Sequence, residues 1–169
     1  MTVTLPDLGT GFTVQPVTGL KALDDSIFGI RLEALENIGE IAVNLPDTIE
    51  SKIISMALHD RVPDVRMRAV TTLGKYFSYS KNSNVFKTAL NDSSYKVVSR
   101  AFKVISEKDS GLAHEVASKL EKDSSGIIYS RLSDFYKTST EDKIDYYGRA
   151  MRLSSVLNRY NVTNSLEQY

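Results

Sequence analysis

One pattern of apolar residues occurs four times in this chain of 169 residues, at intervals of 31 to 35 residues. Each copy has an alanine or leucine at its centre, a β-branched residue four positions earlier, and an apolar or aromatic residue four positions later. The central residues are Ala34, Ala69, Ala101 and Leu132. A period of this length indicates stacked helical hairpins, because one hairpin is too small to bury its own apolar face. The pattern therefore predicts an all-α fold made of repeated hairpins.

The spacing of apolar residues also predicts where the helices lie. Stripes with a helical period surround the four central residues, and the helices that carry them should begin near Phe28, Asp64, Tyr95 and Ile127. Partner helices with their own stripes are expected within residues 49–58, 85–90, 112–120 and 144–157. Short polar segments separate the stripes; Pro63 suits a first helical turn, and Ser110 is expected to begin another helix. We predict a short right-handed α-solenoid of about eight helices.

The two ends of the chain differ from the repeats. Residues 1–22 contain Pro6, Pro16, several glycines and short alternating stretches, so they are expected to form an extended or irregular lead-in with at most a short strand. The repeat domain should span residues 23–160, and residues 161–169 should form a tail. The N-terminal segment lacks a basic start and an apolar core, so we expect no export signal, and the cytoplasm is slightly favoured.

Composition excludes several classes of protein. The 21 Lys and Arg residues balance the 21 Asp and Glu residues, which disfavours a dedicated nucleic-acid binder. The chain has no cysteine, so disulfides and thiolate metal sites are excluded. No apolar run approaches the ~18 residues that a membrane-spanning helix needs. We therefore expect a monomeric chain without a membrane partner, and a nucleic-acid partner is disfavoured.

No catalytic pattern is complete. His114 and Glu115 match the start of the zinc motif H-E-x-x-H, but Ser118 stands where the second histidine is needed. His59, next to Asp60, suits a helix end. No nucleophile elbow or glycine-rich phosphate loop is present. We expect no catalytic residue, no metal and no cofactor, and hence no enzyme activity in this chain.

Basic residues recur on the helices that carry the central residues. Arg68, Arg100 and Arg131 each stand one position before a central residue. Other basic positions outside the apolar stripes are Lys75 and Lys103, and Glu33, Glu36 and Asp134 interrupt the set. This predicts a mildly positive inner groove that would favour an acidic peptide, a protein surface or a carboxylate. Alternatively, these are solvated side chains whose aliphatic stems cover the core. The candidate interaction residues are Arg31, Arg68, Lys96, Arg100, Arg131 and Tyr146.

Residues 58–70 (LHDRVPDVRMRAV) resemble the central part of a HEAT repeat, in which an aspartate in the hairpin turn is followed six residues later by an arginine. Asp60 with Arg66 matches this pair, as does Asp25 with Arg31. The resemblance implies a ladder of such pairs between neighbouring repeats. Val98 and Tyr129 replace the arginine in the later copies, so the ladder is expected in the first half of the chain and is in doubt in the second.

A second resemblance covers about residues 23–160. Residues 28–35, 89–97 and 120–126 are similar to the C-terminal helical-repeat region of gluzincin-type zinc aminopeptidases, which packs against the catalytic domain and helps to enclose the substrate cavity. That catalytic domain is missing from this chain, and no catalytic residue is carried over. Three functions stay open: a non-catalytic scaffold that docks a protein or peptide, a structural module of such an aminopeptidase, and a weakly basic repeat associated with nucleic acid.

Overall fold

A computed structural model describes residues 21–40, 47–123, 125–136 and 148 of the chain. Within them lie seven α-helices and no strand, which confirms the all-α class for this part of the chain. The helices are α2 (Phe28–Glu40), α3 (Asp47–His59), α4 (Pro63–Tyr76), α5 (Tyr79–Ala89), α6 (Tyr95–Lys108), α7 (Ser110–Leu120) and α8 (Gly126–Tyr136). The helix expected within residues 144–157, the lead-in up to residue 20 and the tail from residue 161 lie outside the described residues.

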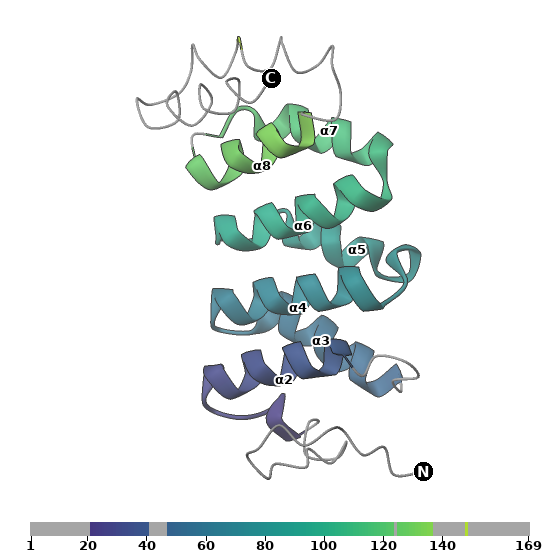
Figure 1. Ribbon diagram of the computed structural model, residues 1–169, viewed down its shortest axis with the longest axis vertical. Coiled ribbons are helices and arrows are strands. Elements are labelled where there is room, and N and C mark those ends of the chain that lie inside the picture. The colour runs from purple at the N-terminus through teal and green to yellow at the C-terminus, as the bar shows by residue number, and fades with distance from the viewer. Residues whose placement is uncertain (1–20, 41–46, 124, 137–147, 149–169) are drawn as a thin grey trace.

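The helices form two rows (Figure 1). Helices α2, α4, α6 and α8 follow one another in what we call the front row, and each contacts the next. Helices α3, α5 and α7 lie behind them in the back row, and each contacts the front-row helix that follows it in sequence. The front-row helices begin at Phe28, Pro63, Tyr95 and Gly126, within one residue of the predicted starts. Successive hairpins therefore lie side by side in the order of the sequence.

The apolar stripes meet in the core between the two rows. All four central residues are buried, as are the β-branched Val65, Val97 and Ile128. Ile30, the equivalent residue of α2, is exposed. The largest fully buried side chains are Phe86 from α5 and Phe102 from α6. Each hairpin thus completes its core with residues of its neighbours, as the repeat period implies.

Two helix starts show local chemistry of different kinds. Pro63 occupies the first turn of α4, where its missing N–H leaves no partner unsatisfied. The residue that caps α7 is Asp109, whose side chain accepts a hydrogen bond from the backbone N–H of Leu112 at 3.0 Å. Ser110, the residue that we expected to begin this helix, is its first helical residue and leaves the capping to Asp109.

Candidate interaction surface

Each front-row helix is preceded by an aspartate that folds back on its own turn. Oδ1 of Asp25, Asp60, Asp92 and Asp123 accepts a hydrogen bond from the backbone N–H two residues later. These four bonds are 2.7 to 2.8 Å long. A short acidic side chain favours this kind of turn because it replaces a backbone acceptor. All four front-row helices therefore begin from the same local geometry.

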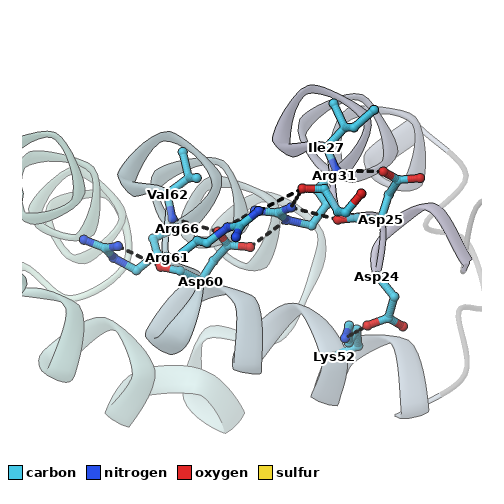
Figure 2. A network of polar contacts seen from close by, with 10 residues as sticks. Asp24, Asp25, Ile27, Arg31, Lys52, Asp60, Arg61, Val62 and Arg66 are labelled. Atoms are coloured by element: carbon cyan, nitrogen blue, oxygen red, sulfur yellow. Dashed lines mark hydrogen bonds and ion pairs between the residues drawn. The ribbon is translucent and has the colours of Figure 1, made fainter.

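Arginines link these turns from one hairpin to the next, and we call the two links the turn ladder. Arg31 donates to both carboxylate oxygens of Asp60, with Nε–Oδ2 and Nη2–Oδ1 distances of 2.8 and 2.9 Å. Its Nη1 donates to the backbone oxygen of Asp25 at 2.8 Å. Figure 2 shows the Arg31 guanidinium between Asp25 and Asp60. In the second link, Arg66 donates to both oxygens of Asp92 at 2.7 and 2.8 Å and to the backbone oxygen of Asp60 at 2.8 Å.

This arrangement refines the pairing expected from sequence. Asp25 with Arg31, and Asp60 with Arg66, do interact, but through the backbone oxygen of the aspartate. The carboxylate of each ladder aspartate binds the arginine of the preceding hairpin instead. An arginine that holds two turns at once fixes the spacing of neighbouring hairpins, because its five donors lie in one rigid plane.

The ladder keeps its buried charges ionised. Burial alone would raise the pKa of Asp60, but the hydrogen bonds from Arg31 and from the backbone of Val62 lower it below its ordinary value. The same balance, with Arg66 and the backbone of Ser94 as donors, lowers the pKa of Asp92. The Asp92 carboxylate correspondingly raises the pKa of Arg66.

The ladder stops after Asp92. Val98 and Tyr129 occupy the positions equivalent to Arg31 and Arg66, and both are buried. Burial and the nearby carboxylates of Asp123 and Glu121 raise the pKa of the Tyr129 hydroxyl. Arg31 has a structural role within the ladder: we predicted it on the interaction surface, but it is only 6% exposed and is bound to Asp60. We therefore leave it out of that surface.

Three other arginines, which we call the arginine column, lie at equivalent positions on α4, α6 and α8: Arg68, Arg100 and Arg131. The pKa of Arg100 is lowered by burial first, and then by the positive charges of Arg131 and Arg68. The guanidinium group of Arg100 is therefore close enough to those of Arg68 and Arg131 to be repelled by both.

The members of the column differ in their partners. Arg68 forms an ion pair with Glu36 of α2 at 3.5 Å, and its buried Nε has no hydrogen-bond partner. Arg131 donates from Nε to Ser99 Oγ at 3.2 Å and from Nη1 to Asp134 at 3.4 Å. Arg100, which is partly buried, has no hydrogen bond or ion pair with any described residue. The middle of the column is thus its least compensated point.

Lys96, another predicted interaction residue, lies on α6 four positions before Arg100. Lys96 forms an ion pair with Asp64 at 2.9 Å, which joins α6 to α4. Glu33 and Glu36 are exposed on α2, so the surface changes from acidic on α2 to more basic on α4 and α6. Tyr146 lies outside the described residues.

A pocket of ≈240 Å³ opens between α4 and α6, near their C-terminal ends. Its charged lining consists of Lys75, Arg100, Lys103, Lys108 and Glu107. Gly74 and Val104 also line it, and a Cβ placed on Gly74 would lie 2.4 Å from Val104 Cγ2. Lys75, Arg100 and Lys103 were expected on this surface from the sequence, but the pocket was not. Gly74, a glycine inside an apolar helical stripe, was the available signal, since such a glycine indicates a close approach of backbones.

Among the described residues, no group of three or more His, Asp or Glu side chains is placed to hold a metal. His114, on the surface of α7, has Nδ1 2.8 Å from the backbone oxygen of Ser110, and its ring packs edge-on against Phe135. His59, the last residue of α3, is exposed. In this part of the chain no helix combines the length and apolar character needed to span a bilayer.

Comparison with known proteins identifies no relative: no family model matches the chain, and no curated protein sequence matches it.

Proposed function

We propose that the chain is a non-catalytic scaffold, a short right-handed α-solenoid of HEAT-like hairpins, which binds an acidic segment of a partner protein along the arginine column. The observation that carries the proposal is the state of Arg100. This side chain is partly buried between two other arginines and forms no ion pair with a described residue; the charge of Glu107 offsets the repulsion only in part. Burial and repulsion make the charged state of this guanidinium unfavourable, and an incoming carboxylate would offset that free-energy cost.

Electrostatics explains why a carboxylate suits this position. The lowered pKa of Arg100 means that its surroundings disfavour the charged form. A carboxylate that accepts two hydrogen bonds from the guanidinium would reverse that effect, because charge-assisted bidentate pairs are the strong ones. The partly buried site also screens the interaction less than open water does. A ligand with acidic residues at several positions would contact Arg68 and Arg131 as well.

The acidic residues on the same surface favour a protein segment over a nucleic acid. Asp64, Glu36 and Asp134 pair with basic residues along the surface. A continuous phosphate backbone would meet these carboxylates as well as the arginines, whereas a peptide can place its acidic groups selectively. The net charge of zero supplies no long-range attraction for nucleic acid.

The test is a charge reversal in the column. A fluorescently labelled glutamate-rich peptide should bind the full chain, with an affinity that decreases as salt is added. In the double variant Arg68→Glu with Arg100→Glu, binding should weaken by more than about tenfold, because both contacts become repulsive. The matched control is Lys87→Glu with Lys119→Glu, which makes the same change of charge on exposed residues of the back row.

Two results would refute the proposal. One is unchanged peptide affinity of the double variant at low ionic strength, with its helical circular dichroism intact. The other is a DNA duplex that binds more tightly than the peptide and loses its binding in the same variant. The second result would instead assign the column to nucleic acid.

A further inference from the structure

We propose that the pocket between α4 and α6 binds a phosphate group carried by a side chain of the partner, that is, a phosphorylated residue within the acidic segment. This inference rests on the proposed function and names the anchor point of the same surface. Arg100 belongs to both sites, since it stands in the arginine column and also lines the pocket.

The charge around the pocket matches a dianion. Lys75, Arg100, Lys103 and Lys108 contribute four positive charges, and Glu107 contributes one negative charge. Both helices end here, and each helix C-terminus carries a partial charge of about −0.5. Together these leave an excess of about two positive charges, and a phosphate monoester carries about −1.5 to −2 near neutral pH. A single carboxylate would neutralise only about half of the excess.

The cations themselves are largely uncommitted. Arg100 has no ion-pair partner among the described residues. Lys103 lies 3.8 Å from Glu107, near the upper limit for an ion pair. The Nζ of Lys75 lies 4.8 Å from the centre of the Tyr76 ring, a contact that leaves its N–H donors accessible. Lysines on flexible stems can converge on a phosphate, and the planar Arg100 guanidinium can bind two of its oxygens.

The shape of the site follows from the packing of the two helices. Gly74 lets α4 pack closely against Val104 of α6. Because glycine has no side chain, the pocket stays open at a position that a larger residue would fill. The resulting ≈240 Å³ is many times the volume that one water molecule requires. The pocket is open to solvent, so a phosphate group on a side chain of the partner can enter it from the surface.

The experiment uses the full chain and small probes at constant ionic strength. Phosphoserine, inorganic phosphate and acetate are titrated separately while backbone amides are followed by NMR. Phosphoserine and inorganic phosphate should give saturable shifts at Thr71, Gly74 and Lys103, and acetate should bind at least about tenfold more weakly because it is a monoanion. Lys75→Gln with Lys103→Gln should weaken phosphoserine binding by about tenfold or more.

Two further variants sharpen the result. Glu107→Gln removes the one acidic group in the pocket and should tighten phosphoserine binding by a few-fold. This variant tests the site even if the double lysine variant is poorly folded. Lys87→Gln with Lys119→Gln, the matched control in the back row, should leave the affinity unchanged.

The absence of saturable shifts around the pocket, or equal affinities for acetate and phosphoserine, would overturn this inference. The proposed function would survive that outcome if the glutamate-rich peptide still bound and Arg68→Glu with Arg100→Glu still weakened its binding by more than about tenfold. If phosphate shifts the pocket amides but the peptide does not bind at all, the pocket stands and the wider docking function fails.

Discussion

At the scale of single residues, Gly74 controls how closely two front-row helices approach. Its position within α4 faces Val104 of α6, and an added methyl group would lie 2.4 and 2.8 Å from the two γ-carbons of that valine. Distances this short require either the Val104 side chain or one of the helices to shift. The glycine is therefore required by packing, although it lowers the intrinsic helix propensity of α4.

The first prediction concerns this glycine. Gly74→Ala should lower the free energy of unfolding by about 1 to 3 kcal/mol, because overpacking outweighs the gain in helix propensity. Gly29→Ala is the matched control, since nothing lies within 4 Å of a Cβ at Gly29 in α2, and it should leave stability equal or raised. Urea denaturation of both variants is the measurement. A stabilised Gly74→Ala variant would contradict the packing argument, whereas rescue by adding Val104→Ala would support it.

The second prediction concerns pH. Asp60 and Asp92 have folded-state pKa values below the ordinary 3.8, so below pH 3.8 the unfolded chain takes up protons more readily than the folded chain. Their contribution to stability is complete well above that pH and is lost as pH falls through the folded pKa values. Asp92→Asn, which preserves the turn acceptor, should flatten this acid dependence in denaturation curves between pH 5 and 2. Asp24→Asn, a substitution of an exposed aspartate outside the ladder, should leave the acid dependence of stability unchanged. If Asp92→Asn and the unsubstituted chain lose stability in parallel as the pH falls, the ladder is not the source of the acid dependence.

At the scale of secondary-structure elements, the turn ladder determines how the hairpins are joined. It links the start of α2 to the turn before α4, and the start of α4 to the turn before α6. Neither arginine nor aspartate is exposed in these links, so each ion pair is only weakly screened. No equivalent arginine is available between α6 and α8, because Val98 stands at that position.

The third prediction follows from the burial of the ladder. Arg66→Met keeps an unbranched apolar stem but leaves the Asp92 carboxylate without its counter-ion, which should cost about 3 kcal/mol. Lys119→Met removes one member of the exposed pair with Glu115 and should cost no more than about 0.5 kcal/mol. Chemical denaturation of the two variants gives the comparison. Similar small losses in both would mean that the buried link contributes no more than a surface ion pair.

At the scale of the whole molecule, the described helices differ in how many of the other described helices they contact. Helices α4 and α6 each contact a front-row helix on both sides as well as helices of the back row. Among the described helices, α8 has substantial contacts with α6 and α7 only. No arginine of the turn ladder links it to α6. A stack of hairpins is stabilised chiefly by contacts between neighbours, so stability should differ along it.

The fourth prediction is therefore a gradient of hydrogen exchange. Under native conditions, backbone amides in α4 and α6 should exchange most slowly, and those in α8 should exchange faster through local opening. Exchange followed by NMR at single amides measures this directly. Equal protection of α8 and α4 would show that contacts other than the ladder and the described packing stabilise α8.

The sequence by itself determined the class of the fold and the position of the front-row helices. Those properties depend on local spacing: an apolar residue at every third or fourth position specifies a helix and the face that it buries, and the period of 31 to 35 residues specifies repeated hairpins. The sequence also showed the aspartates of the turns, and it showed that Val98 stands where the earlier hairpins have an arginine. Each is a feature of residues close together in the chain.

Only the tertiary structure decided which partners these residues find. Arg31 was predicted on the surface because its position lies outside the apolar stripe, yet it is buried because Asp60, 29 residues away, supplies its counter-ion. The pocket needs Gly74 and Val104 to meet from different hairpins, and the repulsion at Arg100 comes from arginines on two neighbouring helices. Charge and close packing act through space, so they are set by how the hairpins stack and not by the spacing within any one of them.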